Sequence, residues 1–246
     1  MLKFFRTIRK KLIEEDNVRK YLFYAIGEIL LVVIGILIAL QVNNWNEQRK
    51  EQRIAEGIQS SIIKDLKSDL NYIDALRIQV DAEINAYDSL QLKLTDPGVS
   101  ERMIVNLIRD EFIPYSITFE GFNGNSYRTA SSSGSVNFLT ESKRTALFTL
   151  YTKQSGAIQK INTYEMFYLN AISDFNAYYP QQVPFTTFRS GPVYDLKWQN
   201  PDFQDLTSRF NSVGTSKRNY YRVLFIQLDE IEKLSLEVLS KLEGQI

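Results

Sequence analysis

Cysteine and histidine are both absent from the 246 residues of the chain. Their absence excludes disulfides, thiol nucleophiles, zinc or haem ligation through these side chains, and histidine-based acid–base catalysis. Basic and acidic residues balance at 29 each, so the zero net charge gives no electrostatic reason to expect a nucleic-acid partner. We therefore expect a protein without cofactor or metal ion. A calcium site built from oxygen ligands and an enzyme that uses carboxylates alone are the alternatives left open, and no acidic pair stands out for the enzyme.

Sequence motifs of common catalytic sites are also missing. The chain has no Gly-x-Ser-x-Gly elbow, phosphate-binding loop or dinucleotide fingerprint. The serine-rich run 131–135 lies near Lys143, which resembles the pieces of a Ser-Lys enzyme. A polar turn that leads into a helix explains the same residues better, so we predict no catalytic residue.

One long apolar run dominates the N-terminal part. Residues 21–42 read YLFYAIGEILLVVIGILIALQV, which as a helix is about 33 Å long and spans a bilayer core of roughly 30 Å. Basic residues outnumber acidic ones in the preceding segment, MLKFFRTIRKKLIEEDNVRK. The positive-inside rule then predicts a cytoplasmic segment 1–20, a single inner-membrane span 21–42 and a periplasmic domain 43–246. Since little chain is then left inside the cell, we expect any signal across the membrane to need a partner.

Two features near this run have competing explanations. A cleaved signal peptide would need a shorter apolar stretch and a small-x-small cleavage site, and Ile38–Gln41 is a poor one, so an uncleaved anchor is preferred. Apolar residues of the first dozen fall on one helical face, with basic residues opposite. This pattern is typical of a helix lying on membrane lipid, or of an ordinary basic segment that sets topology.

Glu28 is the single charged residue of the apolar run. Gly35, Ala39 and Asn43 follow at steps of 7, 4 and 4, which puts all four on roughly one helical face. Since small residues four apart let a second helix approach closely, this face predicts a contact with another membrane protein or with a second copy. A tolerated glutamate without function and a proton or ion relay are the alternatives.

The rest of the chain favours a mostly α fold. No proline interrupts residues 43–96, and apolar residues recur there at helical spacing, so the membrane helix is expected to continue to about Asp96. We expect further helices at 100–108, from Thr140 to Pro180, and from about Thr215 onward. The long helices should pack as an antiparallel bundle with the anchor helix as its spine.

Two connectors lack a helical pattern. Residues 114–135 are rich in glycine, serine and asparagine and are expected to form a loop. Residues 180–201 contain four prolines, which favours short strands or extended segments.

Aromatic residues are abundant, with 14 tyrosines and 15 phenylalanines. Most should be core. The others are candidates for an aromatic interaction surface for a peptide, a glycan or another subunit, because amphipathic aromatics are favoured at interfaces. The candidates are Tyr164, Tyr168, Tyr178, Tyr179, Phe185, Phe188 and Trp198.

The N-terminal 50 residues also carry a resemblance. The motifs Ala25–Ile29 (AIGEI) and Leu40–Asn46 (LQVNNWN), together with the serine-glycine turn of Ser131–Tyr151, resemble a large family of uncharacterised single-pass inner-membrane proteins of Bacteroidota-type bacteria. The resemblance implies inner-membrane placement and makes Glu28 part of a shared motif. It implies no activity, catalytic residue or cofactor.

These observations lead to one preferred hypothesis and two rivals. We expect a non-enzymatic, membrane-anchored interaction protein, an accessory or scaffolding subunit of an inner-membrane complex. The first rival is a periplasmic ligand-binding module, similar to a sensor, that acts with a separate signalling partner. The second is an envelope enzyme that uses carboxylates alone.

Overall fold

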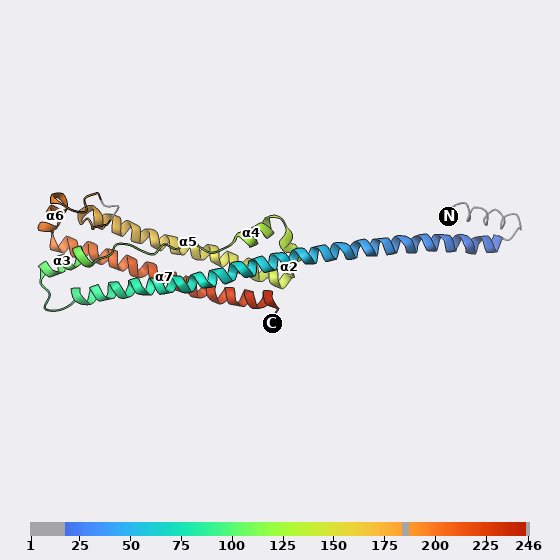
Figure 1. Ribbon diagram of the computed structural model, residues 1–246, viewed down its shortest axis with the longest axis horizontal. Coiled ribbons are helices and arrows are strands. Elements are labelled where there is room, and N and C mark those ends of the chain that lie inside the picture. Colours follow the sequence, from blue (N-terminus) through green and yellow to red (C-terminus); the bar gives the residue numbers. More distant parts are fainter. Residues whose placement is uncertain (1–17, 184–186, 245–246) are drawn as a thin grey trace. The chain divides into compact units, whose positions relative to one another are not determined.

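The computed structural model describes residues 18–183 and 187–244. In chain order its helices are α2 (Val18–Leu94), α3 (Glu101–Glu111), α4 (Asn125–Ser132), the 3₁₀ turn η1 (Ser135–Phe138), α5 (Glu141–Tyr178), α6 (Pro192–Gln199) and α7 (Phe203–Glu243) (Figure 1). No strand occurs among the described residues. The predicted mostly α class is therefore confirmed.

The chain divides into two units, residues 1–57 and residues 58–246, and the division falls within α2. In the first unit the described residues form one helix, with nearly every side chain of the apolar run exposed. The amphipathic segment expected in the first dozen residues lies outside the described residues. The predicted boundaries at 20/21 and 42/43 stay predictions, while the compact unit begins at Ile58.

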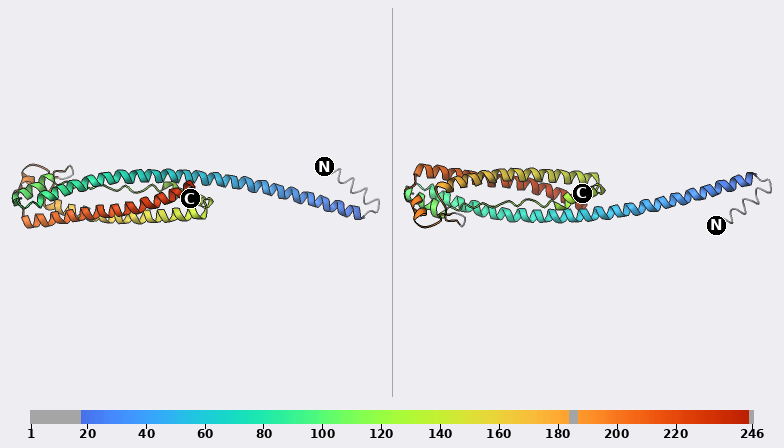
Figure 2. Two further views of the ribbon diagram at one scale, coloured as in Figure 1. Left: turned by 90° about the horizontal axis from the view of Figure 1, so that it is seen from below. Right: turned by 90° about the horizontal axis from the view of Figure 1, so that it is seen from above.

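The second unit is built from three long helices packed lengthwise: the C-terminal part of α2, α5 and α7 (Figures 1 and 2). Ion pairs Lys67–Glu243 and Arg77–Asp229 set α2 antiparallel to α7. Between α5 and α7, Lys153 pairs with Glu230 and Asp174 with Arg209, so these two helices are antiparallel as well. The α2 and α5 helices consequently run in the same direction, and α7 runs in the opposite direction.

An extended segment, residues 112–124, lies between α2 and the α5–α7 pair (Figure 2). We call it the strap. The strap forms no strand, and only its end bonds to a helix, where the Gly124 carbonyl accepts from the Arg128 amide of α4. A buried backbone group without a partner is costly. Side chains of the three long helices supply the partners instead. The bonds join Tyr168 to the Pro114 carbonyl, Lys217 to the Tyr115 carbonyl, Tyr220 to the Ile117 carbonyl, Tyr221 to the Ile117 amide, Tyr72 to the Glu120 amide and Asp69 to the Asn123 amide.

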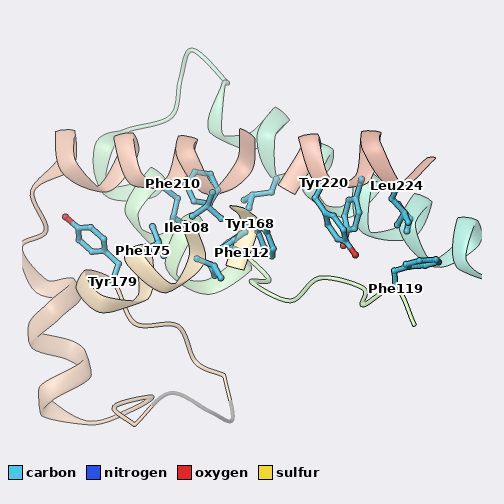
Figure 3. Packing of buried hydrophobic residues seen from close by; sticks show 14 of the residues in the cluster. Ile108, Phe112, Phe119, Tyr168, Phe175, Tyr179, Phe210, Tyr220 and Leu224 are labelled. Carbon is cyan, nitrogen blue, oxygen red and sulfur yellow. The ribbon is translucent and has the colours of Figure 1, made fainter. Parts of the chain in front are cut away.

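The core of the second unit is dominated by aromatic rings (Figure 3). Phe112 at the start of the strap packs edge-to-face against Phe175 of α5 and Phe210 of α7, with ring centroids 6.1 and 5.1 Å apart. Tyr168, Tyr220 and their neighbours present an apolar ring to the core and a hydroxyl to the strap. Tyrosine suits this position because one end is apolar and the other donates a hydrogen bond.

Several predicted boundaries are confirmed. The α2 helix ends at Leu94, and Ser100 caps α3 by accepting a hydrogen bond from the Met103 amide at 3.3 Å. The α5 helix opens after Thr140 and ends at Tyr178, just before Pro180.

Three predictions for the connectors were wrong. The last helix begins at Phe203 instead of Thr215, because Asp202 caps it and its first turns bury apolar side chains despite the polar run around Gly214. Residues 192–199 form α6 instead of strands, since Pro192 occupies the first helical turn, where its missing amide hydrogen costs nothing. The loop expected at 114–135 contains α4.

Candidate functional site

A groove of about 430 Å³ lies between α2 and α7 in the second unit. From α2 it is lined by Glu83, Ile84, Tyr87 and Asp88, and from α7 by Lys217, Arg218, Tyr221, Arg222, Phe225, Ile226 and Asp229. We call it the α2–α7 groove. Its floor is apolar and aromatic and its charged groups lie around it, as in many sites for small molecules.

Gly214 is the reason that Tyr87 can lie at one end of this groove. A Cβ atom at position 214 would be 1.6 Å from the Tyr87 hydroxyl oxygen and 2.7 Å from Cζ. The Tyr87 ring also stacks with Phe210 at a centroid separation of 6.3 Å, and burial raises the pKa of its phenol. A glycine inside a helix normally weakens it, so its presence here is explained by this close approach.

A buried ionic network closes the inner wall. Lys217, which is 4% exposed, forms an ion pair with Glu83 at 2.9 Å. It also donates to the carbonyl oxygens of Tyr115 at 2.7 Å and Ile113 at 3.4 Å. The Tyr221 hydroxyl donates to the same carboxylate, and burial together with this bond raises the pKa of the phenol. All three ammonium hydrogens of Lys217 therefore have partners, and the network fastens the strap to α2 and α7.

The outer rim of the groove carries two arginines one helical turn apart. Arg218 contacts Asp88 and Gln91 and lies over the Tyr87 ring, with its guanidinium carbon 5.5 Å from the centroid. Within the described part of the chain, Arg222 is exposed and has no carboxylate at ion-pair distance. The rim therefore carries one guanidinium without a carboxylate partner among the described residues.

A second polar cluster lies under the strap, around Asp69 of α2. This side chain is 1% exposed, and its Oδ1 accepts from the Asn123 amide at 2.9 Å and from Asn123 Nδ2 at 2.7 Å. Its Oδ2 has no hydrogen-bond partner, and nor do the buried Gln154 Nε2 and Tyr151 hydroxyl of α5. Burial raises the pKa of Asp69 to about 6, although the bonds from Asn123 act in the opposite direction.

The residues predicted for a membrane-helix contact lie in the first unit. Gly35, Ala39 and Asn43 are exposed and Glu28 is partly exposed. A Cβ atom at Gly35 would meet nothing within 4 Å, so this side of the helix is open to close approach. Within the described residues, one helix near the N-terminus is long and apolar enough to cross a membrane, a test that a signal sequence would also pass.

The predicted aromatic interaction surface needs correction. Tyr168, Tyr179 and Trp198 are core residues with exposures of 0, 5 and 3%. The rings of Tyr179 on α5 and Trp198 on α6 pack against each other, whereas Tyr168 lies near the strap and Lys217 of α7. Trp198 donates to the Pro180 carbonyl at 2.9 Å and Tyr179 to Asp205 at 2.9 Å, so their polar atoms are also occupied.

Phe185, another candidate, lies outside the described residues. The remaining three candidates are dispersed. Tyr178 is half exposed but lies under the Arg209 guanidinium at 3.7 Å, Phe188 is exposed, and Tyr164 is partly buried against the core. Instead, tyrosines hold the strap, a role that the sequence pattern did not reveal.

The serines near Lys143 form local contacts. The Lys143 ammonium donates to the Gln59 side chain at 2.6 Å, and the Ser133 and Ser135 hydroxyls bond to each other at 2.8 Å. These contacts fit the interpretation of the run as a polar turn leading into α5.

Comparison with known proteins adds a family. A model of a family of unknown function, DUF6090, matches residues 28–181, more than half of the chain. The chain belongs to this family. The DUF6090 match begins at Glu28 and includes Gly35, Ala39, Asn43 and the strap, whereas α6 and α7 lie beyond it. No curated protein and no solved structure matches the chain.

Proposed function

We propose that this chain is a non-enzymatic, membrane-anchored interaction protein, an accessory or scaffolding subunit of an inner-membrane complex. In this proposal residues 21–42 cross the membrane, the N-terminus is cytoplasmic, and residues 43–246 form the periplasmic part. The main support is the apolar part of α2. This helix is long and apolar enough to cross a membrane, and most side chains of its apolar run are exposed.

Glu28 lies on the face of this helix that also carries Gly35 and Ala39. An ionisable side chain inside a bilayer costs at least ~2.5 kcal/mol on insertion scales, so such a face usually lies against protein or water instead of lipid. Gly35 and Ala39 on the same face allow the backbone of a neighbouring helix to approach closely. The neighbour is another membrane protein or a second copy of the chain, and lipid covers the remaining faces.

The buried charges of the second unit support a structural role. Lys217 and Glu83 are the residues most similar to a catalytic acid–base pair, yet their hydrogen bonds go to each other, to strap carbonyls and to Tyr221. A lysine ammonium group whose three N–H donors are all hydrogen-bonded within the protein has no site left to accept a proton from a substrate.

The proposal is tested by paired substitutions on the membrane helix. Gly35→Leu and Gly27→Leu both enter open space, so neither clashes within the chain itself. Position 27 lies about 80° round the helix from position 35, at 100° per residue. We expect Gly35→Leu and Glu28→Leu to reduce the membrane proteins that co-purify with the tagged chain at least tenfold, and Gly27→Leu to leave them unchanged. Equal partner recovery in all three variants would remove this face from the account.

A second candidate function is a periplasmic ligand-binding module that acts with a separate signalling partner. The α2–α7 groove favours it, because a volume of about 430 Å³ is within the usual range for small-molecule sites. Its location differs from the sequence-based expectation, in which aromatics of residues 164–198 would line the pocket. Specific, saturable binding of a small molecule in the groove would support this candidate.

A further inference from the structure

The α2–α7 groove combines an apolar floor with one arginine that has no ion-pair partner. Ile84, Tyr87 and Phe225 supply apolar and aromatic surface. Three acidic and three basic residues also line the groove. Lys217 pairs with Glu83 and Arg218 with Asp88, while Asp229 shares Arg77 with Glu232. In the described part of the chain, Arg222 is the basic lining residue without an ion pair.

We propose that this groove binds a free single-chain carboxylate of the fatty-acid type. The carboxylate binds the Arg222 guanidinium, and the chain lies along the floor between α2 and α7. The inference rests on the second candidate function, the ligand-binding module, and names the class of ligand for it.

The head group follows from the chemistry of arginine. A guanidinium presents two parallel N–H donors that match the two oxygens of a carboxylate, and such charge-assisted bonds are roughly twice as strong as neutral ones. A cationic or neutral head would leave Arg222 without a partner. A dianionic phosphate would face the nearby Asp88 and Asp229 carboxylates with more repulsion than a monoanion does.

The tail follows from the size and lining of the groove. At interior packing density, 430 Å³ holds on the order of 20 non-hydrogen atoms. This is the size of one medium or long alkyl chain, and the seam between two packed helices is elongated in the same way. Ile226 is 54% exposed at the edge, where a larger side chain would extend over the groove without disturbing the core.

The test uses the full chain in lipid nanodiscs and a dodecanoate that carries a photoreactive diazirine in mid-chain. Cross-linked peptides are identified by mass spectrometry. The membrane helix takes up label from the bilayer, and so provides an internal reference for probe concentration. We expect labelling of residues 83–88 and 217–229 that saturates and that unlabelled dodecanoate competes away, whereas dodecanol competes at least tenfold less well.

Three variants sharpen the test. Arg222→Gln should reduce groove labelling about tenfold, the loss expected for one charge-assisted contact. Ile226→Trp should block the groove and reduce labelling to a similar extent. Arg102→Gln, which removes an exposed arginine of α3, should leave labelling unchanged.

The outcomes separate this proposal from the membrane-helix proposal. Label confined to the membrane helix, or groove labelling equal for dodecanoate and a dodecanol probe or unaffected by Arg222→Gln, would overturn the assignment. None of these results changes how many partner proteins co-purify with the Gly35→Leu variant. Conversely, if Gly35→Leu does not reduce partner recovery, the expected labelling of the groove is unchanged. Circular dichroism of each variant verifies that the helices are intact, so reduced labelling reports binding.

Discussion

Replacement of Asp69 by asparagine should stabilise the protein at neutral pH. At pH 7.5 the carboxylate is ionised while 1% exposed. Burial raises its pKa from 3.8 to about 6. A shift of about two units corresponds to about 3 kcal/mol against folding with the group ionised, at 1.36 kcal/mol per unit. Asparagine is neutral, nearly the same shape, and still offers an oxygen to Asn123.

The raised pKa of Asp69 already includes the opposing effect of the two bonds from Asn123. Removing the charge should therefore gain up to about 3 kcal/mol in the free energy of unfolding. We therefore expect Asp69→Asn to raise the free energy of unfolding by 1 to 3 kcal/mol, a range of order-of-magnitude accuracy.

The pH dependence gives an independent reading of the same effect. The folded protein binds a proton at Asp69 near pH 6, whereas the unfolded chain does so only near pH 4. The wild type should therefore lose stability as pH rises from about 4 through 6, and the penalty should be complete above that window. The Asp69→Asn variant should lack this component.

Urea unfolding followed by circular dichroism, on the full chain in mild detergent at pH 4.5 to 8, measures both quantities. Asp74→Asn on the exposed side of the same helix is the matched control and should keep the wild-type pH profile. The reasoning is refuted if Asp69→Asn is no more stable than wild type at pH 7.5 and has the same pH profile.

Two further substitutions test packing around the α2–α7 groove by the same unfolding assay. Gly214→Ala should lower the free energy of unfolding by about 1–3 kcal/mol, because the new Cβ atom displaces the Tyr87 ring. Gly156→Ala on α5 places its Cβ atom in open space and should raise the free energy of unfolding by about 0.5–1 kcal/mol. Equal effects of the two variants would contradict the close approach of Tyr87 to Gly214. Lys217→Met should lower the free energy of unfolding by about 2–3 kcal/mol, less than the loss of a fully buried ion pair would, because Glu83 is partly exposed. An unchanged free energy of unfolding would mean that the network does not hold the strap.

The sequence predicted the long helices well because their signals are local and repeated. The α2 pattern extends over many turns without proline, and both Asp96-Pro97-Gly98 and Pro180 are strong stop signals. The start of α7 was misjudged, since the run around Gly214 has low helix propensity and its helical state depends on packing against Tyr87. No local rule reveals a partner 127 positions away along the chain, counted as 214 minus 87.

The functional residues show the same limit. Aromatic abundance correctly suggested a large core, but not that Tyr168, Tyr220 and Tyr221 satisfy the backbone of the strap. The prediction of a loop gave no sign that side chains of three long helices would fasten the backbone of the strap. The face of Glu28 and Gly35 could be read from spacing alone, because it depends on one helix only.

The most direct test of the central claim is purification of the tagged full-length chain from its native membrane in mild detergent, with the mass and composition of the particle read by mass spectrometry. The account predicts a particle with other membrane proteins in fixed stoichiometry, which Gly35→Leu disrupts and Gly27→Leu does not. A lone monomer, or an oligomer of this chain alone, would contradict the role as an accessory subunit.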